Sequence, residues 1–321
     1  MIPKNREDYL KIFLISFACY CALTIGESWD EDFHFKQGKI TLNYLLSLGQ
    51  IKEEIFNGER YSPSYWTLQY FITQIFSPKY QILVVHFTNL LISLATIIGL
   101  GKLIKEIFNK EAGKIVMIIL FFYPVFFGHM GFNGKDTILA FSHVWITYLL
   151  IKYIKYHHDS IKINKYVIFI ALLTALSTGI QIAFIGSLFP ILLFIAIDTF
   201  FLKKLRSKKF DNKRLFFDLL KFLVIFYFSL ILFWIDTHPN IFTLPYKFFI
   251  GTLSEDFWSG WPYTIINGEY FYSDKVSKLY IIKNIIFKSP EYFLILYIIF
   301  FFLFLKKRLF YLKKIKNFNY L

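Results

Sequence analysis

The stretch YQILVVHFTNLLISLATIIGLGKLI, residues 80–104, decides the fold class of this chain. A helix of this length crosses the hydrocarbon core of a bilayer, which is about 30 Å thick. Comparable apolar runs lie at 9–26, 114–130, 136–154, 166–180, 182–202, 215–235 and 290–305. The hydrophobic fraction of 56% and the mean hydropathy of +0.49 exceed those of ordinary soluble domains. The sequence therefore predicts an all-α integral membrane protein, a single polytopic domain over residues 1–321 with about eight transmembrane helices.

The distribution of charge sets the predicted orientation. The chain has 36 Lys and Arg residues against 22 Asp and Glu residues, a formal net charge of +14. The basic residues gather in short segments between apolar runs, namely 1–6, 105–114, 152–165, 203–214 and 306–316. Such segments stay in the cytoplasm, so we expect a cytoplasmic N-terminus and contacts with membrane lipids. Because the charge follows the topology, the pattern argues against a nucleic-acid partner.

Two long segments, 27–79 and 236–289, fall on the opposite, outer side. The first contains YWTLQYFITQIF (65–76), an aromatic amphipathic stretch that predicts a helix on the membrane surface. The second is rich in Trp, Tyr, Pro and Gly, which predicts an ordered loop with short elements, because flexible linkers are poor in aromatics. Polar residues collect at the outer ends of the predicted helices and are rare in mid-helix. This distribution favours a function at the outer membrane surface over a channel or transporter.

The segment SWDEDFHFKQGK, residues 28–39, places three carboxylates directly after the first apolar run. Asp30, Glu31 and Asp32 could supply a general base or bind a divalent cation, and they could equally form a solvated acidic loop. If the segment is helical, His34 shares a face with Asp30 and Glu31. There it could orient a carboxylate, contact a phosphate or pack among aromatic side chains at the interface.

The stretch FNGKDTILAF, residues 132–141, forms a second polar cluster in a short outer turn. Asn133 begins a turn signal, and Asp136 begins the next helix, where its carboxylate can cap free backbone N–H groups. Lys135 runs against the inside-positive pattern, and a lysine beside a helix N-terminus is a good phosphate ligand. We expect His129, one turn earlier, to face the same place.

The late outer loop contains INGEYFYSDK, residues 266–275, in which Glu269 and Tyr270 follow an Asn-Gly turn signal. Aromatic side chains with a few polar groups line sugar and headgroup pockets, and they also form interfacial belts. The sequence has no Walker A, GxGxxG, HExxH or paired CxxC motif, so soluble nucleotide chemistry finds no support.

Three of these segments together resemble the GT-C superfamily of polytopic glycosyltransferases. The acidic motif from Asp30 to His34 is similar to the first outer loop of the branch with protein O-mannosyltransferases and bacterial lipid A aminoarabinose transferases, a bacterial glycosyltransferase family 39-like branch. The stretch 126–153 resembles a second segment of bacterial members. The stretch 266–275, with a helix expected from Pro290, resembles their later loop and its return to the membrane.

The resemblance implies transfer of a sugar from a polyprenyl-phosphate carrier to an envelope lipid, glycan or protein hydroxyl. The implied reaction would take place at the outer face of a bacterial-type inner membrane. Asp30 or Glu31 would activate the acceptor, and Lys135 with Asn133 would contact the donor phosphate. The other implied substrate contacts are Asp32, His34, His129, Asp136, Glu269 and Tyr270. The resemblance implies no certain cofactor, although a divalent cation could bind at Asp30, Glu31 and Asp32.

The chain also departs from these relatives. Gly134 stands where they have proline, and Gln181 stands where they often have an arginine. The stretch 166–202 is too long for one crossing, and we expect it to divide near Gly179–Gln181. Bacterial relatives commonly continue with more crossings after the eighth run, so the resemblance is to a version short at the C-terminus. The alternative function is a non-catalytic scaffold, a flippase or an assembly subunit for envelope glycans.

Overall fold

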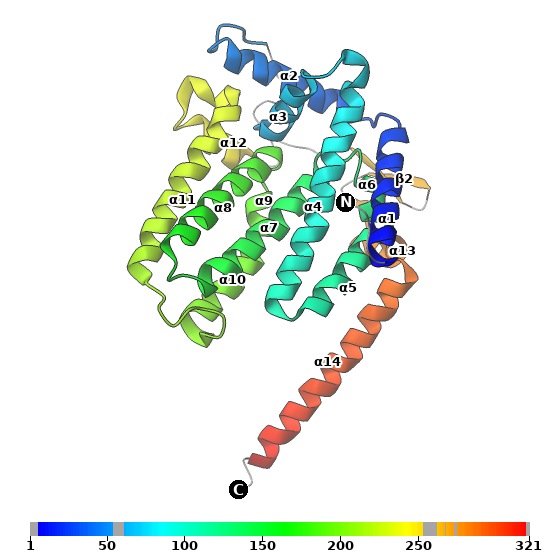
Figure 1. Cartoon of the computed structure of the whole chain (residues 1–321), viewed down its shortest axis with the longest axis vertical. Coiled ribbons are helices and arrows are strands. Elements are labelled where there is room, and N and C mark those ends of the chain that lie inside the picture. Colours follow the sequence, from blue (N-terminus) through cyan, green and yellow to red (C-terminus); the bar gives the residue numbers. More distant parts are fainter. Residues whose placement is uncertain (1–5, 54–60, 253–261, 267, 273–274, 319–321) are drawn as a thin grey trace. The chain divides into compact units, whose positions relative to one another are not determined.

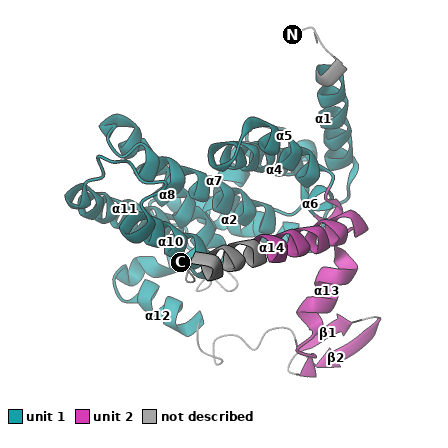
Figure 2. Cartoon of the chain, turned by 90° about the horizontal axis from the view of Figure 1, so that it is seen from below, with its two compact units in different colours: residues 1–122, 126–258 teal, residues 123–125, 259–321 magenta. Residues whose placement is uncertain are grey.

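The computed structural model of the chain describes residues 6–53, 61–252, 262–266, 268–272 and 275–318. These residues form two compact units, coloured separately in Figure 2. Unit 1 comprises Met1–Phe122 and Phe126–Trp258, and unit 2 comprises Tyr123–Val125 and Ser259–Leu321. Each unit is described by itself below.

The chain up to Thr252 is helical almost throughout (Figure 1). Its α-helices are α1 (Arg6–Thr24), α2 (Glu31–Leu46), α3 (Ser64–Thr73), α4 (Gln81–Ile107), α5 (Lys110–Phe121), α6 (Pro124–His129), α7 (Asp136–Lys155), α8 (Ser160–Ile180), α9 (Phe184–Ser187), α10 (Phe189–Ile197), α11 (Asn212–Phe233) and α12 (Leu244–Thr252). Short 3-10 or π-helical turns join some of them, namely η2 (Pro78–Tyr80), η3 (Asp198–Leu202) and η4 (Ile235–Asn240).

Five helical stretches among the described residues are long and apolar enough to cross a membrane. They are Pro78–Ile107, Asp136–Lys155, Ser160–Ile180, Phe184–Leu202 and Asn212–Phe233. A sixth arises if the bent pair Tyr280–Lys288 and Glu291–Lys307, which meet at 115°, counts as one span. The chain is therefore a mostly helical protein with five or six candidate membrane spans, as a multi-pass membrane protein requires.

Two local predictions about helix boundaries are confirmed. The stretch 166–202 divides where expected, because α8 ends at Ile180 and Gln181 is extended. The helix expected within 65–76 is present as α3, which buries one face against the rest of unit 1. Gly179 and the polar Gln181 predicted the break after α8, and the aromatic amphipathic pattern of residues 65–76 predicted α3.

The run 114–130 does not form the single helix that was expected, because α5 and α6 share it. Pro124 has no backbone N–H and disfavours the helical conformation at Tyr123, so α5 ends at Phe121 and a new helix begins. The run 9–26 does form a helix, α1. Its first turns carry charged residues such as Asp8 and Lys11, and α1 is not one of the candidate spans.

The core of unit 1 lies between helices that run side by side. Figure 1 shows α4 beside α7 and α8 beside α11, and the closest helix contacts agree with this arrangement. Leu90 and Ile97 of α4 pack against Ala18 and Ala22 of α1. Within a membrane, such side chains stabilise helix association through close van der Waals packing.

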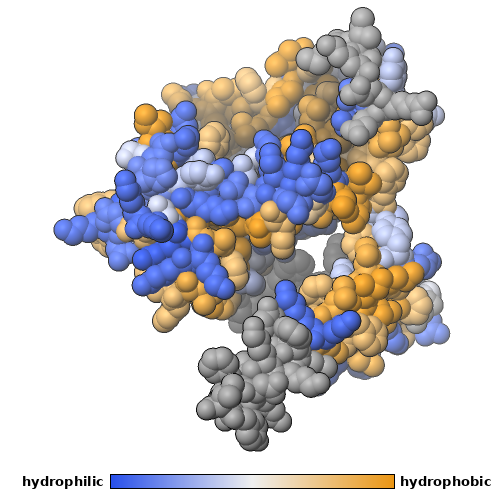
Figure 3. Space-filling view, turned by 60° about the horizontal axis from the view of Figure 1, so that its bottom comes forward, coloured by the Kyte–Doolittle hydropathy of each residue, from blue (hydrophilic) through white to orange (hydrophobic). Residues whose placement is uncertain are grey.

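Three of the Lys/Arg-rich segments lie together at one end of unit 1. Lys152 and Lys155 of α7 pair with the Glu106 carboxylate at the end of α4, at 3.3 and 3.2 Å. Arg214 of α11 donates to the backbone oxygen of His157 at 3.3 Å. These contacts join segments 105–114, 152–165 and 203–214. Figure 3, which brings the bottom of Figure 1 forward, shows hydrophilic side chains gathered at this end.

The opposite end of unit 1 holds α2, α3 and the residues just before α3 (Figure 1). Ser62 N donates to Gly179 O at 2.8 Å, and Ser62 Oγ donates to Leu230 O at 2.7 Å. Trp66 Nε1 donates to Gly134 O at 3.2 Å. A Cβ atom at Gly179 would lie 2.5 Å from Ser62 O, so glycine permits this close approach. Part of the predicted outer segment 27–79 and the predicted outer turn 131–135 therefore meet.

Unit 2 contains a hairpin and two helices: β1 (Tyr263–Ile266), β2 (Glu269–Tyr272), α13 (Tyr280–Lys288) and α14 (Glu291–Phe318). The strands pair antiparallel, with Ile266 opposite Glu269, and Gly268 between them has a φ of 84°. The predicted turn is therefore present at Gly268, while Asn267 lies outside the described residues. The expected short elements are present in the described part of 236–289, while its place as an outer loop stays a prediction.

Candidate functional site

The three carboxylates of the acidic segment have different surroundings. α2 begins at Glu31, and the positive end of its dipole favours acidic residues in this first turn. Asp30 and Asp32 are exposed, and Asp32 pairs with Lys36 of the same helix at 2.5 Å. Glu31, in contrast, is only 5% exposed. The helical form of the segment agrees with the predicted shared face of His34 and the acidic residues.

Glu31 lies in a buried close pair with His86 of α4. Glu31 Oε2 accepts from Ser28 N at 2.5 Å, and Oε1 lies 2.8 Å from His86 Nε2. His86 is fully buried, and its Nδ1 lies 3.0 Å from the carbonyl oxygen of Ala22 in α1. A carbonyl only accepts, so Nδ1 carries a hydrogen.

An aromatic cluster connects the acidic segment with Lys135. His34 stacks on Trp66 with ring centroids 3.9 Å apart, and Tyr61 meets Trp66 edge-on at 5.7 Å. Lys135 Nζ lies 5.6 Å from the Tyr61 ring centroid, within reach of a cation–π interaction. Burial, with a smaller effect from the Lys135 charge, lowers the pKa of His34 to about 3. His34 is therefore neutral at pH 7, and Lys135 acts electrostatically on α2.

The turn before α7 is organised by the Asn133 side chain. Its Oδ1 accepts from Lys135 N at 3.1 Å and from Asp136 N at 2.8 Å. Its Nδ2 donates to Asp136 Oδ2 at 3.1 Å and to His129 Nδ1 at 2.9 Å. The predicted capping role of Asp136 is wrong, because Asn133 supplies the oxygen that caps these N–H groups. His129 does face this turn, as expected, and accepts through Nδ1.

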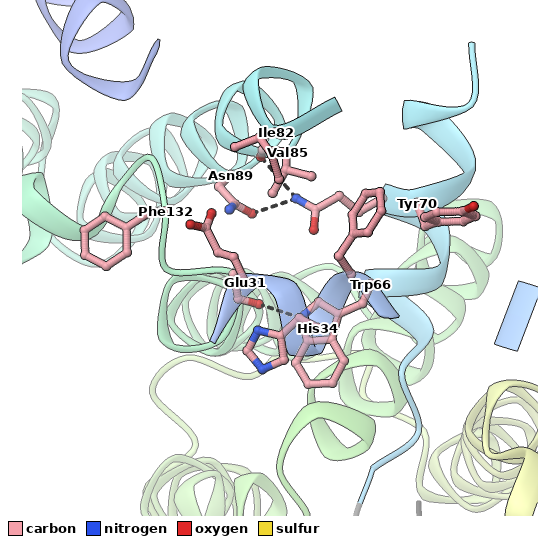
Figure 4. Close-up of a pocket in the computed structure, with 11 residues that line it drawn as sticks. Glu31, His34, Trp66, Tyr70, Ile82, Val85, Asn89 and Phe132 are labelled. Atoms are coloured by element: carbon pink, nitrogen blue, oxygen red, sulfur yellow. Dashed lines mark hydrogen bonds between the residues drawn. The ribbon is translucent and has the colours of Figure 1, made fainter. Parts of the chain in front are cut away.

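A small pocket of about 10 Å³, partly open to solvent, lies between these segments. Its lining includes Glu31 and His34 of α2, Gln69 of α3, Asn89 of α4 and Gly134. Asn89 Oδ1 accepts from Gln69 Nε2 at 3.0 Å, while the buried Asn89 Nδ2 has no hydrogen-bond partner among the described residues. Figure 4 shows the Asn89 amide and the Glu31 carboxylate turned toward each other. The acidic segment and the 132–136 turn therefore share one pocket.

Several side chains of this site were not singled out from sequence: Tyr61, Tyr65, Trp66, Gln69, His86 and Asn89. Polar and ionisable residues inside the run 80–104 were a usable signal, because such groups are costly in a membrane span and need partners. No comparable signal marks the aromatic residues, since aromatic side chains are common throughout the chain.

The remaining predicted residues lie elsewhere or have other partners. Glu269 and Tyr270 lie exposed on β2 in unit 2, and their substrate contact stays a prediction. Gln181 is exposed beside a separate open pocket of about 330 Å³ that includes His143. Among the described residues, no group of three or more His, Cys, Asp or Glu side chains is arranged to hold a metal ion. A cation at Asp30–Asp32 also stays a prediction.

No protein-family model, no curated protein and no solved structure matches this chain. Fold and site together define a mostly helical protein with several candidate membrane spans. Its acidic segment, a lysine and a set of buried polar groups meet at the end of unit 1 that lies away from the Lys/Arg-rich segments.

Proposed function

We propose that this protein is a GT-C-type membrane glycosyltransferase. It moves a sugar from a polyprenyl-phosphate carrier to a hydroxyl of an envelope lipid, glycan or protein at the outer face of a bacterial-type inner membrane. One observation carries the proposal: the acidic segment and the turn that holds Lys135 line one pocket, and Lys135 Nζ lies 5.6 Å from the Tyr61 ring of the aromatic cluster around His34. Transfer from a phosphate carrier needs a base for the acceptor and a cation for the leaving group.

The proposed roles follow from exposure and charge. The exposed Asp30 carboxylate takes the acceptor hydroxyl proton while the acceptor oxygen bonds to the anomeric carbon. The bond from that carbon to the phosphate oxygen breaks, and polyprenyl phosphate leaves with the electron pair. Lys135 stabilises the phosphate, and a divalent cation could share this task. Asp32, His34, His129, Asn133, Asp136, Glu269 and Tyr270 are the further substrate contacts that the proposal includes.

The proposed topology has eight crossings and a cytoplasmic N-terminus. It adds α1 and the α5–α6 pair to the candidate spans, with the bent pair counted as one. Support comes from the grouping of the Lys/Arg-rich segments at one end of unit 1. Reporter fusions within 203–214 and within 240–280 test it. The proposal predicts opposite sides of the membrane, and reporters on the same side would contradict it.

Mass spectrometry of envelope glycans with and without the gene tests the function. We expect one sugar to disappear from an envelope glycan in the deletion strain and to return with the wild-type gene. Lys135→Met should fail to restore it, whereas Lys39→Met, an exposed lysine of α2, should restore it. An unchanged glycan profile in the deletion strain contradicts the proposal. Restoration by Lys135→Met would favour a non-catalytic scaffold, flippase or assembly subunit.

A further inference from the structure

Asp30 and Glu31 are neighbours in sequence, but the structure gives them different tasks. Asp30 is exposed and precedes α2, and its side chain makes no capping hydrogen bond. Glu31 is buried, with Oε2 bound to Ser28 N and Oε1 against His86 Nε2. A carboxylate whose two oxygens are both engaged in a buried site is poorly placed to take a proton from a substrate hydroxyl.

We propose that Glu31 and His86 form a positioning pair that fixes the acidic segment so that Asp30 faces the substrate. This inference rests on the proposed glycosyltransferase function, because its test includes the rate of sugar transfer. His86 links three elements: its Nδ1 binds Ala22 O near the end of α1, its ring belongs to α4, and its Nε2 meets Glu31 at the start of α2. Glu31 in turn holds Ser28 N, two residues before Asp30.

Burial explains why the pair can act as an anchor. His86 is 0% and Glu31 5% exposed, so neither side chain can exchange its partner for bulk water. Removing one partner leaves the other buried and unsatisfied, which is more costly than losing both together. Replacing Glu31 or His86 alone should therefore release the segment that carries Asp30.

Glutamine at position 31 separates positioning from basicity. Its amide oxygen can accept from Ser28 N, and its amide N–H can donate to His86 Nε2 while Nδ1 still donates to Ala22 O. Glu31→Gln can therefore keep the Ser28 hydrogen bond and the polar contact with His86, but its amide cannot act as a base. Asp30→Asn removes the proposed base and leaves the pair untouched. Glu31→Ala and His86→Ala break the pair.

The experiment measures sugar transfer and thermal unfolding for these variants in proteoliposomes, with the exposed Glu27→Gln as control. We expect Glu31→Gln to keep the wild-type melting temperature and most of the transfer rate. Asp30→Asn should keep the melting temperature and lose at least about a hundredfold in rate. Glu31→Ala and His86→Ala should each lower both quantities, and the double variant should lose less stability than the two single losses combined.

Two results would overturn the positioning pair. If Glu31→Gln has the wild-type melting temperature but the rate of Asp30→Asn, Glu31 is the base. If Glu31→Gln is as unstable as Glu31→Ala, or if the two alanine substitutions are additive, the pair does not anchor the segment. Should the wild type transfer no sugar, the proposed function fails, and the unfolding data alone still decide whether the pair exists.

Discussion

His34→Phe should remove a pH dependence of stability that the wild type shows. Phenylalanine keeps a ring stacked on Trp66 but has no titratable group. Burial, with Lys135 as the smaller cause, lowers the pKa of His34 from 6.5 to about 3. As pH falls from 6.5 toward 3, the unfolded chain binds a proton that the folded chain does not, so the folded state loses about 1.4 kcal/mol per pH unit. Between pH 7 and 5 this loss is about 2 kcal/mol.

The assay is unfolding in detergent at pH 7 and at pH 5, for the wild type and for His34→Phe. Other titrating groups affect both proteins equally, so the difference between them isolates His34. We expect the wild type to lose about 2 kcal/mol more than His34→Phe over this interval. Equal losses, within about 0.5 kcal/mol, would show that the site does not hold His34 neutral.

Lys135→Met provides the companion measurement. Because Lys135 is the smaller of the two causes, its removal should reduce the wild-type loss without abolishing it. Lys39→Met, at an exposed position on α2, should leave the loss unchanged. If Lys135→Met behaves as the wild type does, the lysine does not act on α2, and the contact that carries the proposed function is absent.

Two further predictions concern the backbone at this end of unit 1. Gly179→Ala should destabilise the protein by about 1–3 kcal/mol, because the new Cβ would lie 2.5 Å from Ser62 O. Gly186→Ala, where a Cβ meets nothing within 4 Å, is the control in the same unfolding assay, and equal effects would contradict the packing. Asn133→Ala should cost about 1 kcal/mol through the lost cap and should also slow transfer. The control is Asn109→Ala, which removes the N-terminal cap of α5 at the opposite end of unit 1 and should cost a similar free energy of unfolding. If Asn109→Ala slows transfer as much as Asn133→Ala does, the effect of Asn133 on transfer is not local to the site.

The helices and their boundaries were largely predictable because they depend on local sequence. The break after Ile180 follows from Gly179 and Gln181, and α3 follows from its aromatic periodicity. The run 114–130 was misjudged because its length and hydropathy outweighed Pro124, which ends the helical conformation locally. A hydropathy value averaged over the whole run is not sensitive to the one backbone N–H that Pro124 lacks.

The site was predictable only in part, because its contacts join residues far apart in sequence. The two polar clusters were expected on one side of the membrane, and Lys135 does act on His34. The pairing of Glu31 with His86 could not be predicted, because it depends on which face of α4 meets the start of α2. Asn133 caps α7 because the tight turn places its side-chain oxygen within hydrogen-bond distance of the N–H groups of Lys135 and Asp136.

The most direct test of the account is sugar transfer by the purified protein in proteoliposomes. The donor is the polyprenyl-phosphate sugar fraction from the source membrane, with an envelope extract as acceptor. The account predicts transfer by the wild type and at least about a hundredfold slower transfer by Asp30→Asn and by Lys135→Met, with unchanged melting temperatures. Wild-type rates in both variants would contradict the claim that the acidic segment and Lys135 form one catalytic site.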